Sequence, residues 1–249
     1  MQAVLETRNL NKAFGGLAVT REVNFQLGPG ARHALIGPNG AGKTTFINQL
    51  TGVLSPTSGR VLLNGEDITG LPPHLRVKRG MARTFQINTL FPHMTPLEAV
   101  TLAICEREAD TTRWFASLSN HARVVEEAYE LLQRLDLTCV CNRPTRELAY
   151  GRQRLLEIAL SLASSPKVLL LDEPAAGVPT GEAGALFEVI AALPSDISIL
   201  LIEHDMELVF QFAERITVLV SGAILVEGSP QKIAADERVR EVYLGAGHD

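Results

Sequence analysis

One stretch of this sequence decides its fold: Gly37-Pro38-Asn39-Gly40-Ala41-Gly42-Lys43-Thr44, followed by Thr45. The run up to Thr44 fits the pattern G-x-x-x-x-G-K-[ST]. Glycines let backbone N–H groups converge on phosphate oxygens, and the start of a helix adds a dipole that favours anions. We therefore predict that this loop binds phosphates, that Lys43 neutralises the β- and γ-phosphates, and that the Thr44 hydroxyl ligates Mg²⁺. The alternative is a glycine-rich turn that only caps a helix. A short apolar strand predicted over 33–36 and a helix predicted over 43–50 frame the loop and argue against that alternative.

A second motif lies at the end of an apolar strand predicted over 168–171, where Asp172 and Glu173 follow directly. Ligands of open α/β sheets bind at the carboxyl edge of the strands. Asp172 is predicted to hold Mg²⁺ through its water shell, and Glu173 to orient or deprotonate the attacking water. Taken alone, the two carboxylates could equally be a solvated strand end or cap the next turn. The phosphate loop in the same chain favours the catalytic interpretation.

Strand and helix patterns alternate on both sides of a helical middle. Strands are predicted over 4–9, 23–27, 33–36, 61–63, 66–68, 81–85, 168–171, 197–202, 216–220 and 223–226. Helices are predicted over 43–50, 96–106, 122–135, 153–163, 181–193, 205–213 and around 231–243. The dipeptide Asn64-Gly65 is a strong hairpin signal. The pattern predicts an α/β fold with a P-loop (RecA-like) parallel sheet core, an N-terminal antiparallel β subdomain and an inserted α-helical subdomain. We expect one domain over 1–249, with the core in 1–87 and 165–249 and the helical part in about 88–164.

Composition narrows the class further. The 249 residues are 46% hydrophobic and 20% charged, which is typical of a globular protein, and the net charge of -5 argues against nucleic-acid binding. The longest apolar runs are strand-sized, and the polar residues among the first ten predict no signal peptide. We expect a cytoplasmic protein whose membrane association comes through a partner. The three cysteines, Cys105, Cys139 and Cys141, are predicted to be reduced thiols.

Three further features of the sequence narrow the class of P-loop protein that the chain resembles. Gln86 ends the strand predicted over 81–85, Leu148-Ala149-Tyr150-Gly151-Arg152-Gln153 precedes a predicted helix, and His204 follows the strand predicted over 197–202. In this order of phosphate loop, glutamine, signature, acidic strand and histidine, the chain resembles the nucleotide-binding domain of ABC transporters over essentially its whole length.

The resemblance implies roles for single residues, with ATP and Mg²⁺ as ligands. Gln86 would contact Mg²⁺ or the attacking water, His204 would contact the γ-phosphate, and Phe14 would stack on adenine with Val19 beside it. Taken singly, Gln86 and His204 read as ordinary loop residues and Phe14 as a core residue. Only their joint presence supports these roles.

The signature has its own physical logic, because Gly151 leaves N–H groups open at the start of the helix predicted over 153–163. In this family the signature serves the ATP held by the opposite subunit, so the run Leu148 to Gln153 would act in trans. The resemblance therefore implies a dimer in which two chains sandwich two nucleotides.

Within the family, several stretches are similar to the ATPases of branched-chain amino-acid importers. They are Gly15-Gly16-Leu17-Ala18-Val19, Arg83-Thr84-Phe85-Gln86, Leu148-Ala149-Tyr150-Gly151, Glu173-Pro174-Ala175-Ala176-Gly177 and Ile202-Glu203-His204-Asp205-Met206. This class implies an ATPase that drives uptake of a small organic solute from the inner face of the cell membrane. The implied partners are transmembrane permease subunits docked near 87–96, a second, non-identical ABC ATPase subunit and, indirectly, a secreted solute-binding protein. Two alternatives remain: an ABC exporter ATPase for lipid, and a non-transport nucleotide-dependent binding module. Glu173 argues against the module, because a clamp needs no base.

The chain also departs from the family pattern. Ala149 replaces the common signature serine, and Tyr150 and Arg152 stand where Gly and Gln are usual. Pro179 replaces an Asp or Asn that would bridge the two nucleotide sites. We therefore expect weaker communication between the sites.

Overall fold

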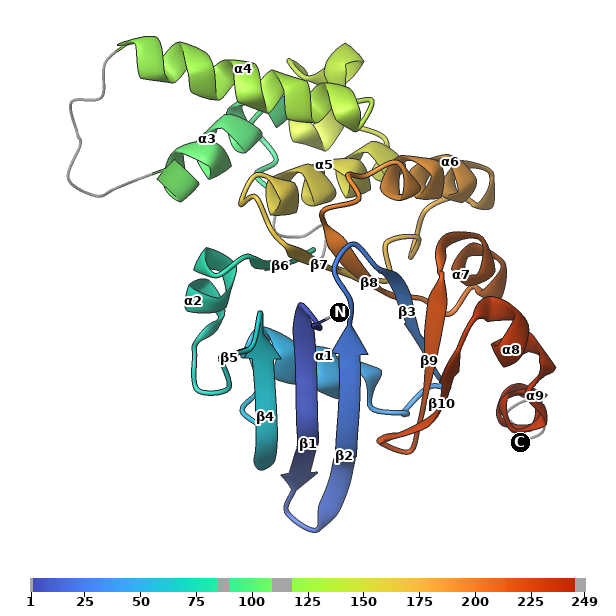
Figure 1. Cartoon of the computed structure of the whole chain (residues 1–249). Helices are drawn as coiled ribbons and strands as arrows, with labels where there is room; N and C mark the ends of the chain where they lie inside the picture. The colour runs from blue at the N-terminus through green and yellow to red at the C-terminus, as the bar shows by residue number, and fades with distance from the viewer. Residues whose placement is uncertain (1, 85–89, 109–117, 245–249) are drawn as a thin grey trace. The chain divides into compact units, whose positions relative to one another are not determined.

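Two β-sheets organise the chain (Figure 1), whose computed structural model describes residues 2–84, 90–108 and 118–244. The antiparallel sheet has the order β2-β1-β4-β5 and contains β1 (Leu5–Phe14), β2 (Leu17–Leu27), β4 (Ser58–Leu63) and β5 (Glu66–Asp67). The other sheet has the order β10-β9-β3-β8-β7-β6 and contains β3 (Arg32–Ile36), β6 (Met81–Arg83), β7 (Val168–Asp172), β8 (Ser198–Ile202), β9 (Arg215–Val220) and β10 (Ala223–Gly228). In this sheet β9, β3, β8 and β7 run parallel, whereas β10 is antiparallel to β9. The predicted fold class is confirmed.

Burial explains why the central strands read as apolar runs. Nearly every residue of β3, β7 and β8 is buried, as expected for parallel strands covered on both faces. The hairpin between β4 and β5 also follows the sequence, because Asn64 and Gly65 take φ values of 52° and 83°. Positive φ at both turn residues suits the twist of a tight hairpin, and it selects Asn-Gly.

The helices match most of the predicted ranges, with four differences of more than two residues, one of which is that the helix predicted over 122–135 begins four residues earlier, at Leu118. Their bounds are α1 (Lys43–Thr51), α2 (Pro73–Lys78), α3 (Pro96–Glu108), α4 (Leu118–Arg134), α5 (Tyr150–Leu162), α6 (Thr180–Ala191), α7 (Met206–Phe212), α8 (Pro230–Ala235) and α9 (Glu237–Leu244), with short 3-10 turns η2 (Thr138–Val140) and η3 (Thr145–Glu147). The short helix α2 was not predicted. The single helix predicted around 231–243 is instead two, because Asp236 leaves the helical conformation and accepts the N–H of Arg238. The helix predicted over 153–163 begins three residues earlier, at Tyr150.

The chain divides into two compact units. One unit comprises Met1–Met81, Lys167–Glu173 and Pro194–Asp249, and the other comprises Ala82–Pro166 and Pro174–Leu193. We call them the core unit and the helical unit. The division groups 174–193 with the helical residues, whereas the sequence analysis assigned them to the core.

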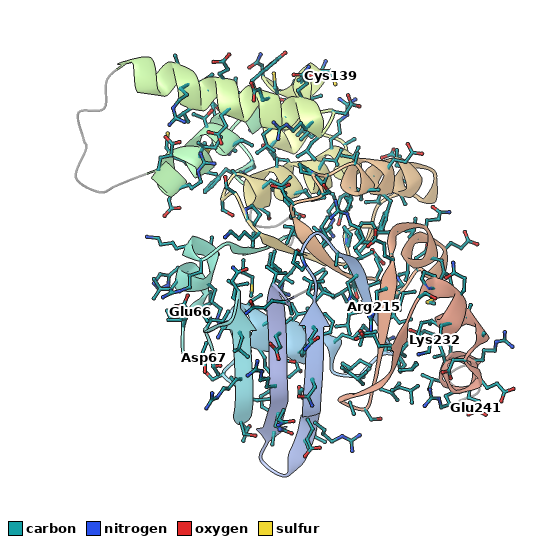
Figure 2. All side chains as sticks on the ribbon, in the orientation of Figure 1. Glu66, Asp67, Cys139, Arg215, Lys232 and Glu241 are labelled. Carbon is teal, nitrogen blue, oxygen red and sulfur yellow. The ribbon has the colours of Figure 1, made fainter. Side chains whose placement is uncertain are left out.

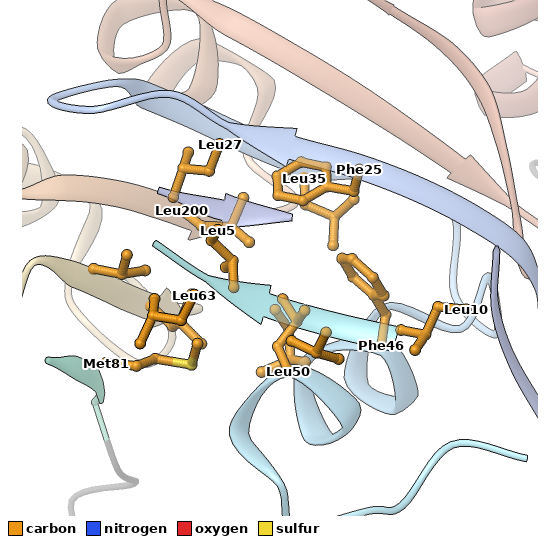
Figure 3. Close-up of a cluster of buried hydrophobic side chains, with 14 of the residues drawn as sticks. Leu5, Leu10, Phe25, Leu27, Leu35, Phe46, Leu50, Leu63, Met81 and Leu200 are labelled. Carbon is orange, nitrogen blue, oxygen red and sulfur yellow. The ribbon is translucent and has the colours of Figure 1, made fainter. Parts of the chain in front are cut away.

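A continuous apolar cluster holds the core unit together (Figure 3). Phe46 and Leu50 of α1 pack among buried side chains of the strands, including Leu5, Phe25 and Leu35. The rings of Phe25 and Phe46 meet edge to face with centroids 5.7 Å apart. The helix that follows the phosphate loop is therefore anchored by its buried face.

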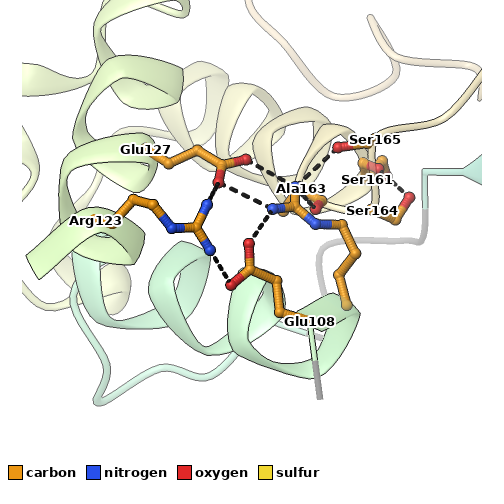
Figure 4. A network of polar contacts seen from close by, with 8 residues as sticks. Glu108, Arg123, Glu127, Ser161, Ala163, Ser164 and Ser165 are labelled. Atoms are coloured by element: carbon orange, nitrogen blue, oxygen red, sulfur yellow. Dashed lines mark hydrogen bonds and ion pairs between the residues drawn. The ribbon is translucent and has the colours of Figure 1, made fainter. Parts of the chain in front are cut away.

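Ion pairs and carbonyl contacts tie the helical unit together (Figure 4). From α3, Arg107 donates to both carboxylate oxygens of Glu127 on α4, at 2.8 and 2.9 Å, and to the carbonyl of Ala163 at the end of α5. Arg123 of α4 forms an ion pair with Glu108 of α3. One cation thus joins three helices, with a side chain that is 22% exposed.

Figure 2 places Cys139 at the surface of the helical unit, whereas Cys105 is half-buried and Cys141 is buried. All three cysteines are free thiols, as predicted. Over the described ranges, no helix combines the length and the apolar character needed to cross a membrane.

Candidate active site

The phosphate loop lies between β3 and α1, and close packing requires two of its three glycines, Gly37 and Gly42. A Cβ at Gly37 would lie 2.2 Å from the carbonyl oxygen of Leu219, and one at Gly42 would lie 2.7 Å from that of Val19. Gly42 also has φ of 98°, in the region that favours glycine. The Lys43 ammonium folds back over the loop and donates to the carbonyls of Gly37 at 2.6 Å and Pro38 at 3.1 Å.

The environment of Lys43 joins the loop to the acidic strand end. Burial lowers the pKa of its ammonium, and the carboxylates of Glu173 and then Asp172 oppose that fall. The amine and both carboxylates therefore share one electrostatic environment in the core unit. The carboxylates at the end of β7 therefore interact with the phosphate-loop lysine at the carboxyl edge of the parallel sheet, the edge at which ligands of open α/β sheets bind.

Glu173 is held in an unusual backbone conformation. Its φ is 48°, which costs a non-glycine residue about 1–2 kcal/mol. Its N–H donates to the carbonyl of Ile202 at 2.9 Å, so the end of β8 fixes it, and its side chain is exposed. Asp172 is half-buried and pairs with Ile202 in the parallel register of β7 and β8.

His204 follows β8 at the same sheet edge. Its side chain is 67% exposed, and its Nδ1 lies 3.7 Å from the carboxylate of Glu203. Glu203 also accepts the His204 N–H at 3.1 Å, and its side chain is fully buried. The sequence analysis missed Glu203. The signal was available, because an apolar strand that ends in a charged residue is what identified Asp172.

The predicted nucleoside-binding residues lie on the hairpin of β1 and β2. Phe14 is 51% exposed, and the Lys12 ammonium lies 5.1 Å from its ring centroid while donating to the Ser55 carbonyl. Val19 lies beside the phosphate loop, as its carbonyl contact with Gly42 shows. An exposed aromatic ring is thus available on the strand pair that borders the loop. Thr44 is exposed and Thr45 half-buried in the first turn of α1.

The C-terminal helix also reaches the phosphate loop. The hydroxyl of Tyr243 on α9 is buried, and burial raises its pKa to about 12, with the backbone of Gly37 opposing the rise. The first residue of the loop therefore has the phenol as a neighbour. Sequence reasoning missed this contact, because nothing local links the two positions.

The signature residues belong to the helical unit. Leu148 is buried, Ala149 is the N-cap of α5, and Gln153 donates its side-chain amide to the Leu148 carbonyl at 2.9 Å. Gly151 lies inside the first turn of the helix and not before it, which corrects the sequence prediction. The first N–H groups of a helix have no partner within it, so this turn still offers donors from which an anion can accept hydrogen bonds.

One side chain lies close to the signature glycine. A Cβ at Gly151 would lie 3.1 Å from a carboxylate oxygen of Glu182 in the first turn of α6. Because Glu182 is exposed, its carboxylate can move aside for a larger residue at 151. Tyr150 and Arg152 are exposed and half-buried, respectively. Gln86, the last predicted site residue, lies outside the described residues.

A glycine loop at a helix start, a lysine in it and two carboxylates at the edge of a parallel sheet define a P-loop nucleotide-binding protein. Comparisons with known proteins narrow this class. A family model described as ABC transporter matches residues 20–176, and one described as branched-chain amino acid ATP-binding cassette transporter matches 223–249. The chain belongs to the ATP-binding subunits of ABC transporters, in the branched-chain amino acid class. As such, it is an ATPase coupled to transport.

Individual relatives cover almost all of the chain. The high-affinity branched-chain amino acid transport ATP-binding proteins BraF of Pseudomonas aeruginosa and LivG of Escherichia coli are each 40% identical to it. The alignments cover 97% and 98% of this chain, and 98% of each relative. Among solved structures, an ATP-binding cassette of an ABC transporter in its ADP conformation is 32% identical with a TM-score of 0.84, over 98% of this chain and 100% of that one.

Proposed function

We propose that this chain hydrolyses ATP to drive uptake of branched-chain amino acids or related small organic solutes. The observation that carries the catalytic part is the shared environment of Lys43, Asp172 and Glu173. The solute is proposed from the relatives of the same class, two of which are named as high-affinity branched-chain amino acid transport proteins.

In the proposed reaction, nucleotide phosphates replace internal contacts of the loop. The Lys43 ammonium, now bonded to the carbonyls of Gly37 and Pro38, would turn to the β- and γ-phosphate oxygens. Backbone N–H groups from Gly37 to Thr45 would surround the phosphates at the start of α1. Phe14 would offer its exposed face to adenine, with Val19 beneath.

Glu173 would take the proton of the attacking water. Its carboxylate is exposed, and its backbone is fixed by the carbonyl of Ile202, so the base is positioned before nucleotide arrives. His204 would donate to the γ-phosphate, with the buried carboxylate of Glu203 holding its ring. Gln86 is proposed to contact Mg²⁺ or the water, on resemblance alone.

The residues present fit a magnesium ion. The Thr44 hydroxyl and the Asp172 carboxylate are hard oxygen donors, which Mg²⁺ prefers. No group of three His, Cys, Asp or Glu gathers among the described residues, so phosphate and water oxygens would complete the coordination. When bound, the ion would neutralise charge on the β- and γ-phosphates.

The partners follow from the same proposal. We expect transmembrane permease subunits, a second, non-identical ABC ATPase subunit whose nucleotide the signature from Leu148 to Gln153 serves, and a secreted solute-binding protein that acts indirectly. The chain would then work on the inner face of the cell membrane. A lipid exporter ATPase and a nucleotide-dependent clamp are the alternatives. Glu173 disfavours the clamp, because a clamp needs no base.

Reconstitution tests the proposal. The chain, its permease subunits and its partner ATPase are placed in vesicles with ATP on the ATPase side and solute-binding protein on the other side. We expect ATP-dependent accumulation of radiolabelled leucine, isoleucine or valine. Hydrolysis without solute movement in the uptake direction, together with extraction of lipid from the bilayer, would replace import by export. Nucleotide binding without hydrolysis would leave only the clamp.

A further inference from the structure

Tyr150, which departs from the family signature, contacts the segment that follows the catalytic strand. We call residues 174–179, between Glu173 and α6, the post-strand loop. Arg154, one turn after Tyr150 on α5, donates from Nη2 to the Tyr150 hydroxyl at 3.2 Å and to the Ala176 carbonyl of this loop at 3.1 Å. Its guanidinium carbon lies 5.4 Å from the Tyr150 ring centroid. All of these residues belong to the helical unit.

The loop backbone also packs directly on the phenol. A Cβ at Gly177 would lie 2.8 Å from the Tyr150 hydroxyl oxygen and 2.9 Å from its Cζ, and Gly177 has φ of 78°. Both the close approach and the backbone conformation require glycine here. The first turn of α5 therefore holds the loop at two consecutive main-chain positions, Ala176 and Gly177.

The cation in this contact is expensive to bury. Arg154 is 10% exposed and pairs with Glu157, 3% exposed, at 2.9 Å. Arg154 Nε and one Glu157 oxygen are buried with no hydrogen-bond partner in the part of the chain that the structure describes. Such a pair stabilises a fold no better than apolar residues of the same volume.

We propose that Tyr150 and Arg154 are positioning residues that link the signature helix to Glu173 through the post-strand loop. This inference rests on the proposed function, in which the signature engages the partner's nucleotide while Glu173 acts on this chain's own. When the signature docks on the partner's nucleotide, movement of α5 would pull on Ala176 and Gly177 of the post-strand loop. This loop begins one residue after Glu173, so the pull would reach the proposed base. The link acts through main-chain atoms of the loop, so it does not need the Asp or Asn side chain that Pro179 replaces. The proposed link would give the two nucleotide sites a route of communication that does not depend on the side chain at position 179.

The test uses the assembled transporter with its partner ATPase. Tyr150→Phe removes only the hydroxyl. Arg154→Lys keeps the charge beside Glu157 but loses the planar fork in which Nη1 bonds Glu157 while Nη2 bonds Tyr150 and Ala176. We expect kcat for ATP to fall about 10- to 100-fold in Tyr150→Phe, the loss of one hydrogen bond with a charged donor expressed as a rate ratio, and at least as much in Arg154→Lys. The Kd of this chain for ATP should stay the same, because the phosphate loop is untouched. Arg107→Lys is the matched control, since Arg107 also bonds a carboxylate and a carbonyl in the helical unit but does not touch the loop.

A double-mutant cycle separates positioning from general packing. Gly177→Ala should lower kcat by pushing the phenol away, and Tyr150→Ala should make that clash disappear, so the two changes should be clearly non-additive in kcat. Additive effects, or losses of kcat no larger than in Arg107→Lys at equal thermal midpoint, would overturn the inference. A parent complex without ATPase activity would instead overturn the proposed function, so the two failures are distinguishable.

Discussion

Replacing Arg76 by methionine tests whether a buried cation at the C-terminal end of α1, the helix that follows the phosphate loop, stabilises the fold. Arg76 lies on α2 with 1% of its surface exposed. It donates to the carbonyls of Gln49 and Leu50 in the last turn of α1, at 2.8 and 2.6 Å, and to those of Leu71 and Thr69, at 2.9 and 2.7 Å. A guanidinium thus satisfies C-terminal carbonyls of α1, the helix whose N-terminus is proposed to bind phosphate, and its charge complements the helix dipole.

The magnitude follows from two opposing contributions. Four hydrogen bonds from a charged donor stabilise the fold by roughly 6–12 kcal/mol if each contributes about 1.5–3 kcal/mol. Burial lowers the pKa of Arg76 to about 10, which corresponds to a cost of about 3 kcal/mol for the charged form. Methionine keeps most of the apolar stem but leaves four carbonyls without this donor. We expect the free energy of unfolding to fall by about 4 kcal/mol.

The assay is urea unfolding of the isolated chain, followed by far-UV circular dichroism. Arg79→Met is the control, because Arg79 lies just after the same helix and pairs with Glu66 at 3.2 Å, but is 36% exposed. A surface ion pair of this kind contributes about 0–1 kcal/mol, so the control should unfold close to the parent. A loss below about 1 kcal/mol in Arg76→Met would show that water or neighbouring groups satisfy the carbonyls, and the reasoning on buried charge would fail.

Four other changes probe the site and the core. Lys43→Ala should abolish tight ATP binding in a nucleotide titration, and an affinity close to that of the parent would remove the phosphate-loop assignment. Glu173→Gln should bind ATP but lose turnover by about 10²–10⁴-fold and accumulate as an ATP-bound dimer in size-exclusion chromatography; unchanged turnover would make Glu173 a solvated strand end. Gly151→Asp should displace Glu182 and put a carboxylate where the partner's nucleotide phosphate is proposed to dock, with a repulsion of about 4 kcal/mol at 4 Å. Nucleotide photolabelling of the partner should therefore vanish, while this chain is still labelled. The reverse pattern would mean that the signature acts in cis. Burial lowers the pKa of His33 to about 4, so between pH 6.5 and pH 4 only the unfolded state takes up a proton on this residue. The free energy of unfolding of the parent should therefore fall by about 2–3 kcal/mol relative to that of His33→Gln as pH falls from 7.5 to 4.5. Parallel pH profiles of the two proteins in urea unfolding would contradict this.

The buried imidazole has partners that explain why it stays neutral. His33 Nε2 lies 2.8 Å from the Thr217 hydroxyl, which donates to Glu227 at 2.8 Å. Arg215, labelled on β9 in Figure 2, pairs with the other oxygen of Glu227. Protonation would place a second cation near Arg215 in a site that is closed to water. This repulsion adds to the effect of burial, whereas Glu227 partly offsets it.

Local signals predicted well wherever a residue's conformation is fixed by its own neighbours. Gly42 and Gly52 both adopt the left-handed conformation at the two ends of α1, and the predicted helix over 43–50 differs from it by one residue. The hairpin at Asn64-Gly65 is of the same kind. The candidate site was also largely readable, because strand-end carboxylates and a phosphate loop meet by topology once the strands are parallel.

Contacts between segments that are distant in the chain could not be predicted from the sequence. Arg76 looks like a surface residue in a polar stretch, and only the folded chain shows four carbonyls around it. The first turn of α5 was placed too late because Gly151 reads as a break, whereas Gly costs little where no helical hydrogen bond is lost. Tyr150 was noted only as a departure from a motif, and its contact with Gly177 depends on tertiary packing.

The left-handed backbone of Glu173 has an evolutionary consequence. Asn or Gly at this position would relieve about 1–2 kcal/mol of backbone strain, so losing the proposed catalytic carboxylate would make the fold more stable. Stability alone would therefore not select glutamate here. The presence of glutamate at a strained position is what its proposed role in ATP hydrolysis would explain.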